Sequence, residues 1–496
     1  MKPEDTTYSE SLKFVTKSSL LYFGGKGAGS VLQFLYQVIL ARVIGAEFLG
    51  IYYIGLAVSN ILRSCFTFGL DHTIRHFVPR AKGPDEINTL TSGASQISLY
   101  ISISTSIFLI VFFYFYGEHI FKIDNVSSIL TLFICAAIFL SLMTIRLASM
   151  QGQKIIWPSI LIEEISLPAS RILIFLILFA LGYKLFGAIA AYLIASITSF
   201  ILVYNAYRNC TPKAESHSKS YPSHKKLISF SWPISISIIV NTLMIWVGTL
   251  ILGKFNPSKD VAIYAVSARI VTFFGLFFVA VTTIIAPVAS EYFHLNKQKE
   301  LKDLLKTITF YLLGITLPIM LIIGLYPQAV LNIFGAEFQK GSLCLRILLI
   351  GQLINLLIGS SGMLLIMCGR QKTLTKIVIF SSIISISLHL FLIPRWGIVG
   401  AAIASAISFS IFNLILLFFL YSLHKIHPFS LRIAALMFIG GILLLFYSNI
   451  VVEDIFSFKS ILQIISVITI QFLCFLVYAA KENFSEIINY FSSGRH

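Results

Sequence analysis

The chain has 496 residues, of which 57% are hydrophobic and 12% charged, and its mean hydropathy is +0.89. This composition supplies too little polar surface to cover a soluble globule of that size, so the sequence predicts an integral membrane protein. The net charge of +16 accompanies no nucleic-acid-binding motif. We interpret the charge as a signal that sets the orientation of the chain in the membrane and as a source of attraction to anionic membrane lipids.

The apolar runs are about 20 residues long and unbroken, which favours α-helices over barrel strands. Six cysteines are scattered without CxxC or Cys/His spacing, so neither a disulfide framework nor a metal site is indicated. The acidic, polar N-terminus lacks the features of a signal peptide, and the first apolar run is expected to be a retained anchor. No Ser/His/Asp or paired-carboxylate arrangement stands out, so we expect no catalytic residues and no cofactor.

In chain order, the sequence predicts an all-α protein of about 14 transmembrane helices joined by short connections. None of the connections is long enough for a second folded domain. The predicted helices cover residues 18–42, 49–69, 88–116, 127–150, 155–181, 185–207, 227–253, 261–290, 302–325, 342–367, 375–393, 397–423, 429–449 and 459–480.

One stretch of the chain recurs. Residues 39–54 (ILARVIGAEFLGIYYI) align with residues 251–266 at an offset of 212, and each copy reads as a helix end, a polar turn and a helix start. The repeat predicts two pseudo-symmetric six-helix lobes related by an axis along the membrane normal. The predicted division is an N-lobe, a cytoplasmic linker, a C-lobe, and helices 13 and 14 with the C-terminal tail, at residues 1–207, 208–226, 227–425 and 426–496.

Basic residues predict the orientation. If the N-terminus is cytoplasmic, 24 of the 37 Lys and Arg residues lie in or beside cytoplasmic loops and 8 lie outside. The positive-inside rule therefore predicts that both termini are cytoplasmic. The remaining five fall inside predicted helices, and they are Lys26, Arg63, Arg171, Arg269 and Arg346.

A basic side chain at a helix centre costs about 2.5–3.5 kcal/mol, so these five should face a wet cavity or a carboxylate. Lys26 stands out because the glycines of residues 24–29 (GGKGAG) let a neighbouring helix or a substrate approach closely. Each cation has a structural alternative. Lys26 can snorkel to the interface, and Arg269 can pair with a carboxylate. Arg63 can anchor its helix at the cytoplasmic end, and Arg346 can be interfacial.

Glu163, Glu164 and Arg171 form a mixed-charge group within one predicted helix. At 100° per residue, Glu164 and Arg171 return to nearly the same face, about 10.5 Å apart along the axis. A carboxyl group in this place could bind and release a proton and so couple transport to an ion. Alternatively, the two glutamates only neutralise Lys26 or Arg63.

Several stretches resemble the Wzx-type polysaccharide-biosynthesis flippases of the multidrug/oligosaccharidyl-lipid/polysaccharide (MOP) exporter superfamily. They are ARVIGAEFLGIYYIGLAVSNIL, FGLDHTIRHFVPR, IFGAEF, GRQK and LIPRWGIVGAAIASAIS, at residues 41–62, 68–80, 333–338, 369–372 and 392–408. The resemblance spans nearly the whole chain and implies the fold of multidrug extruders (MATE) and lipid II flippases (MurJ), with two lobes around a V-shaped cavity.

The resemblance also implies the substrate, an undecaprenyl-diphosphate-linked oligosaccharide such as an O-antigen, capsule or exopolysaccharide repeat unit. Such a flippase turns it from the cytoplasmic to the periplasmic leaflet of the bacterial inner membrane by alternating access, coupled to an ion. Lipid II flippases keep basic residues on helices 1, 2 and 8, and Lys26, Arg63 and Arg269 match these by helix and charge. Arg171 is a further candidate cation, helices 13 and 14 could line a groove for the lipid tail, and a polysaccharide polymerase and chain-length proteins are candidate partners.

Two other functions fit the sequence less well. A multidrug extruder of the same superfamily would export organic cations and would need carboxylates on its first helices, whereas helix 1 here carries Lys26 and no acid. A membrane polysaccharide polymerase or glycosyltransferase should carry a large outer loop with catalytic residues, but no outer loop here exceeds roughly 20 residues. The sequence therefore favours a flippase over an enzyme.

Overall fold

The computed structural model describes residues 3–121, 123–211, 224–295, 297–358, 360–368, 370–448 and 458–480. All regular elements within these ranges are helices, and nine of the helices found there are long and apolar enough to cross a membrane. The chain is a multi-pass integral membrane protein, and the predicted all-α fold class is confirmed. Most of the predicted linker and the C-terminal tail after residue 480 lie outside the described residues.

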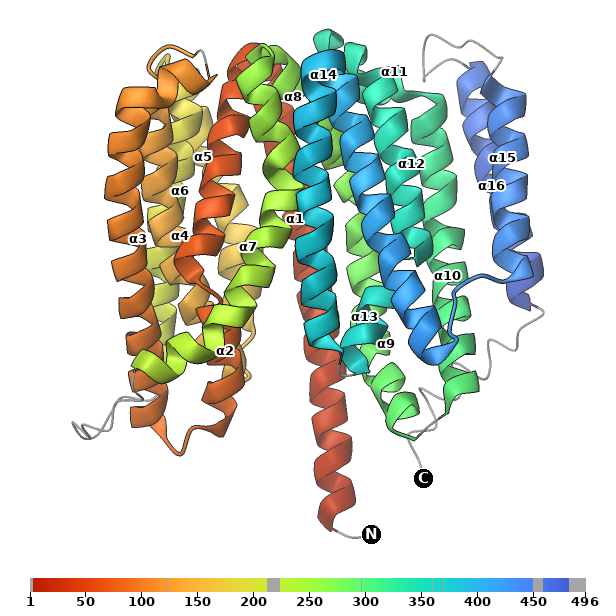
Figure 1. The fold of residues 1–496 in the computed structure, drawn as a ribbon, viewed down its shortest axis with the longest axis horizontal. Helices are drawn as coiled ribbons and strands as arrows, with labels where there is room; N and C mark the ends of the chain where they lie inside the picture. Colours follow the sequence, from red (N-terminus) through yellow and green to blue (C-terminus); the bar gives the residue numbers. More distant parts are fainter. Residues whose placement is uncertain are drawn as a thin grey trace. The chain divides into compact units, whose positions relative to one another are not determined.

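The first part of the chain contains the helices of predicted spans 1–8 (Figure 1). They are α1 (Pro3–Thr67), α2 (Leu70–Phe77), the short η1 (Val78–Arg80), α3 (Pro84–Phe121), α4 (Val126–Gly152), the π-helix η2 (Ser159–Ser166), α5 (Leu167–Ala180), α6 (Leu185–Cys210), α7 (His224–Phe255), α8 (Ser258–Thr272) and α9 (Phe274–His294).

The remaining helices cover predicted spans 9–14. They are α10 (Gln298–Leu325), α11 (Pro327–Asn332), η3 (Ala336–Gly341), α12 (Ser342–Ile358), α13 (Ser360–Met367), α14 (Gln371–His424), α15 (Leu431–Ser448) and α16 (Phe458–Ala480). Every predicted span thus coincides with a helix, part of a helix or two consecutive helices.

Two glycines separate spans that run on as one continuous element. In α1, Gly45 has φ 78° and ψ 171°, and in α14, Gly397 has φ 51° and ψ −126°. A positive φ costs glycine little, because no Cβ meets the backbone. The chain can therefore turn from one span into the next without a loop.

The helices group into two compact units. The first unit comprises residues 21–265 and 378–404, and the second comprises residues 1–20, 266–377 and 405–496. The two lobes inferred from the sequence repeat stay a prediction. The units are defined by compactness, whereas the lobes are defined by internal symmetry.

In the first unit, α4 packs against α2, α3 and α6 (Figure 1). Small hydroxyl residues let α3 and α4 approach closely, which is how membrane helices associate without a hydrophobic driving force. Thr91 and Ser149 hydroxyls lie 2.7 Å apart, and Ser98 donates to Ser141 at 3.4 Å. The buried hydroxyl face of α3 consists of Thr91, Ser95, Ser98, Ser102 and Ser106.

In the second unit, α10 is the common neighbour of α9, α12, α15 and α16. A Cβ on Gly314 of α10 would lie 2.2 Å from the ring of Phe475, so this glycine lets α16 approach closely. The Phe475 ring also stacks on Phe310 with centroids 5.3 Å apart. These contacts attach α15 and α16, the helices outside the predicted repeat, to the unit.

The two copies of the sequence repeat contact each other within the first unit. A Cβ on Gly50, in the first copy, would lie 1.7 Å from the carbonyl oxygen of Ser258, in the second. A Cβ on Gly253 would lie 2.8 Å from the Ile54 side chain. Glycine at these positions therefore permits backbone contact that any side chain would prevent.

We predict that Gly50→Ala destabilises the protein by about 1–3 kcal/mol, because the methyl group meets backbone that cannot rotate away. Gly24→Ala is the matched control, since a Cβ on Gly24 meets nothing within 4 Å. Thermal unfolding of both variants in detergent measures the difference. Equal melting temperatures for the two would contradict the contact between the copies.

Candidate functional site

The predicted fifth span begins as a π-helix, η2, which carries Glu163 and Glu164. Its cause is local, because Pro168 has no N–H to donate to the carbonyl of Glu164, four residues earlier, and its ring crowds that carbonyl. The wider i→i+5 bonding accommodates the mismatch. Short π-helices occur frequently at functional sites, which makes this segment the natural place to look for chemistry.

Glycines of α1 pack directly on this π-helix. A Cβ on Gly29 would lie 2.3 Å from the carbonyl oxygen of Glu164, and one on Gly25 would lie 2.3 Å from Cγ2 of Ile160. Gly24 and Gly27 face open space instead. Half of the glycine run therefore serves the close approach of a neighbouring helix.

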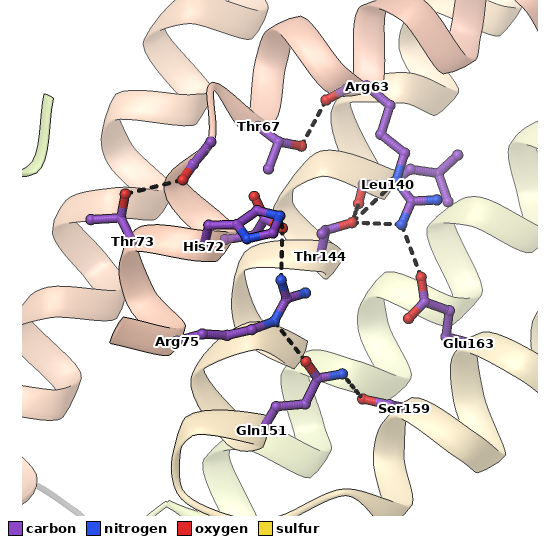
Figure 2. A network of polar contacts seen from close by, with 12 residues as sticks. Arg63, Thr67, His72, Thr73, Arg75, Leu140, Thr144, Gln151, Ser159 and Glu163 are labelled. Atoms are coloured by element: carbon purple, nitrogen blue, oxygen red, sulfur yellow. Dashed lines mark hydrogen bonds and ion pairs between the residues drawn. The ribbon is translucent and has the colours of Figure 1, made fainter. Parts of the chain in front are cut away.

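Arg63 of α1 connects α4 to the π-helix (Figure 2). Its Nη2 donates to Oε1 of Glu163 at 2.9 Å and to Oγ1 of Thr144 at 2.7 Å, and its Nε donates to the same hydroxyl at 3.1 Å. The Arg63 and Glu163 side chains are 27% and 26% exposed. The pair is thus desolvated enough for each charge to need the other.

A second polar chain reaches the beginning of η2 (Figure 2). Nη1 of Arg75 on α2 donates to Asp71 at 3.1 Å, and its Nε donates to Oε1 of Gln151 on α4 at 2.8 Å. Nε2 of Gln151 then donates to the Ser159 hydroxyl at 2.7 Å. The π-helix is consequently held to α4 at two points, Ser159 and Glu163.

Lys26 and Glu164 complete the group. The charges that act most strongly on Glu164 are those of Glu163, Lys26 and Arg63. The structure therefore brings four of the six predicted site residues together, and we call Lys26, Arg63, Glu163 and Glu164 the charged cluster. With both carboxyl groups ionised, its formal charge is zero.

Arg171 lies apart from this cluster, over an aromatic ring. Its guanidinium carbon is 4.3 Å from the centroid of Tyr192, and its buried Nε makes no hydrogen bond to the described residues. The ring faces stabilise the charge in place of a carboxylate. The expectation that Arg171 and Glu164 share a face assumes α-helical rotation and stays a prediction.

Arg269 belongs to the second unit, in the last turn of α8. The helix ends at Thr272, and the predicted eighth span resumes as α9 after Phe273. A cation is favoured at a helix C-terminus, where the carbonyl dipoles point outward. Arg346, the fifth cation, is exposed, and its Nε donates to the carbonyl of Gly324 at 3.0 Å.

Sequence reasoning missed the neutral residues that position the cluster. Thr144, Gln151 and Ser159 carry no local signal, because their partners lie on other helices. Arg146, counted among the basic residues in or beside cytoplasmic loops, lies within the predicted helix 127–150 and within α4, with its guanidinium carbon 5.1 Å from the centroid of the Phe200 ring. Within the described ranges, no three His, Cys, Asp or Glu side chains gather as a metal site would require.

Known proteins with this fold are membrane transporters. The chain superposes on a lipid II flippase, MurJ, in an inward closed conformation, with a TM-score of 0.74 and 17% identity over 93% of this chain and 99% of the other. An inward-facing MATE multidrug transporter of the MOP superfamily matches with a TM-score of 0.65 and 13% identity, covering 80% and 94%. The predicted MATE/MurJ fold is confirmed.

The sequence comparisons then identify the family. The model of the polysaccharide biosynthesis protein family matches residues 15–293, and the MatE model matches residues 233–391. The chain belongs to the polysaccharide biosynthesis protein family, which confirms the resemblance stated above and a transporter rather than an enzyme. A similar protein is the probable low-salt glycan biosynthesis flippase Agl15 of Haloferax volcanii, 26% identical over 412 residues, which are 80% of this chain and 81% of the relative.

We predict that Gly29→Ala displaces the π-helix from α1 and lowers transport several-fold, because the new methyl group meets the Glu164 carbonyl. Gly27→Ala should leave transport near the wild-type level, since a Cβ there meets nothing within 4 Å. Alanine favours the helix over glycine equally in both variants. A flipping assay in liposomes compares them, and equal activities would refute a role for this contact.

Proposed function

We propose that the protein is a flippase for a polyprenyl-diphosphate-linked oligosaccharide, carried on undecaprenyl diphosphate in a bacterial inner membrane. It turns the glycan from the cytoplasmic to the outer leaflet by alternating access. Family membership and the functions assigned to two relatives support this proposal. These are the Haloferax volcanii flippase above and a putative O-antigen transporter of Shigella flexneri, 26% identical over 238 residues, covering 48% of this chain and 56% of the relative.

The observation that carries the proposal is that two cations act on the glutamates of the π-helix within one unit, Arg63 by an ion pair with Glu163 and Lys26 by its charge on Glu164. A diphosphate needs cations in a medium of low dielectric, and a guanidinium can bind it with two parallel hydrogen bonds. Arg63 already presents Nη2 to a carboxylate oxygen at 2.9 Å, a geometry that a phosphate oxygen can take over. Arg171 and Arg269 remain proposed as further contacts to the substrate.

The neutrality of the charged cluster offers a way to couple substrate binding to the binding of a proton. While both glutamates are ionised, they compete with the diphosphate for Lys26 and Arg63. Protonation of Glu164 would leave a net positive charge and favour the substrate, and release of the proton would favour its departure. We propose Glu164 for this role before Glu163, because Glu163 is held by Arg63 at 2.9 Å.

A multidrug extruder is less well supported. An organic cation would need a carboxylate without a competing cation, whereas Glu163 is occupied by Arg63 and the charge of Lys26 acts on Glu164. A cationic drug entering the charged cluster would meet two like charges. The anionic headgroup of a lipid-linked glycan avoids this repulsion.

We predict that Lys26→Ala and Arg63→Ala each lower flipping of a lipid-diphosphate-linked oligosaccharide in liposomes at least tenfold, because about 1.4 kcal/mol of lost contact corresponds to that factor. Lys82→Ala removes an exposed cation and is the matched control for net charge. A cationic dye tests the rival substrate. Transport of the dye by the wild type, or normal flipping by both cluster variants, would refute the proposal.

We further predict that Glu164→Gln removes the acceleration of flipping by an imposed proton gradient while leaving some basal flipping. Glutamine keeps the size of the side chain but cannot take up a proton. Initial rates with and without a pH difference across the liposome membrane measure the effect. Undiminished acceleration in this variant would exclude Glu164 as the coupling group.

A further inference from the structure

Three side-chain amides form a ladder in the second unit. Nδ2 of Asn413 on α14 donates to Oδ1 of Asn355 on α12 at 3.0 Å, and Nδ2 of Asn355 donates to Oε1 of Gln352 at 3.3 Å. Asn413 is 1% exposed, whereas Asn355 and Gln352 are partly exposed. The ladder thus leads from the helix interface to an accessible surface.

The direction of these hydrogen bonds is fixed by the backbone. Nδ2 of Asn413 also donates to the carbonyl of Phe409 at 2.9 Å, and a carbonyl can only accept. The atom of Asn413 that faces Phe409 is therefore its amide nitrogen. The second hydrogen of this nitrogen must meet an oxygen, which is Oδ1 of Asn355. Nδ2 of Asn355 then faces Gln352 and must meet its oxygen, Oε1. The free end of the ladder is therefore a donor, the Nε2 group of Gln352.

The ladder lies near the middle of its predicted spans. At 1.5 Å per residue, its three residues are about 15–24 Å from the ends of the predicted spans 342–367 and 397–423. Partly exposed amides at that depth are costly against lipid and are found facing wet interiors. Close packing of Gly351 on α14, where a Cβ would lie 2.8 Å from Cα of Ala406, brings the two helices together beside the ladder.

Helix association alone would not require the whole ladder. The interhelical bond between Asn355 and Asn413 is sufficient for that purpose. Gln352 lies on the same helix as Asn355, and its Nε2 donates no hydrogen bond within the described part of the chain. The ladder orients a donor that has no acceptor among the described residues.

We propose that Gln352 binds a neutral oxygen acceptor of the transported glycan, such as a hydroxyl, ring or acetamido oxygen, with Asn355 and Asn413 as positioning residues. This inference rests on the proposed flippase function and adds a glycan subsite to it. A neutral amide suits such oxygens, whereas the diphosphate requires cations.

The experiment measures binding to the purified full-length protein in detergent. Its probes are undecaprenyl diphosphate and the lipid-diphosphate-linked oligosaccharide extracted from the native cells. The ratio of the two dissociation constants reports how much the glycan contributes to the affinity. Gln352→Met keeps the length and helix propensity of the side chain but removes the donor, and Gln328→Met, at an exposed glutamine of α11, is the matched control.

We expect Gln352→Met to reduce the preference for the glycosylated lipid about threefold to tenfold, the value of one hydrogen bond, with affinity for undecaprenyl diphosphate unchanged. Gln352→Glu, which replaces the donor by an acceptor, should reduce it as well. An unchanged preference in both variants, an equal loss for both probes, or no preference in the wild type overturns the glycan subsite. Failure of the wild type to bind either probe overturns the proposed function itself.

Discussion

The ion pair between Arg63 and Glu163 is the interaction on which the candidate site depends. Neither charge is stable alone inside a membrane protein, and removing one partner of such a pair leaves the other uncompensated. The 2.9 Å contact therefore links α1 to the π-helix, while Thr144 fixes the guanidinium against α4. A substrate anion that takes the place of Glu163 would release this link, so binding and helix movement are physically connected.

Glycines set how closely the helices of this protein approach one another. Membrane helices gain little from burying apolar surface, so they associate where small residues allow backbone contact. Gly29 brings α1 onto the π-helix, Gly50 brings the two copies of the repeat together, and Gly314 admits Phe475 of α16. Each of these contacts positions a functional or architectural element by close packing.

The two units carry different chemistry. The first unit concentrates charge, with Lys26, Arg63 and two glutamates around a π-helix, and the second presents a ladder of neutral amides.

Much of the fold follows from the sequence alone, because hydrocarbon imposes a strict rule on it. Every backbone polar group must be satisfied within its own segment, so each apolar run of about 20 residues becomes a helix. The cations and carboxylates of the site were also identifiable from the sequence, since a charge in a span is rare and costly. Tertiary structure decided which of them meet. The charges of Lys26, Arg63 and Glu163 act on Glu164, whereas the guanidinium of Arg171 lies over the Tyr192 ring. Only the structure identified the hydrogen-bonding partners Thr144, Gln151 and Ser159 and the amide ladder. Hydrogen bonds between helices produce no periodic pattern in the sequence of either helix.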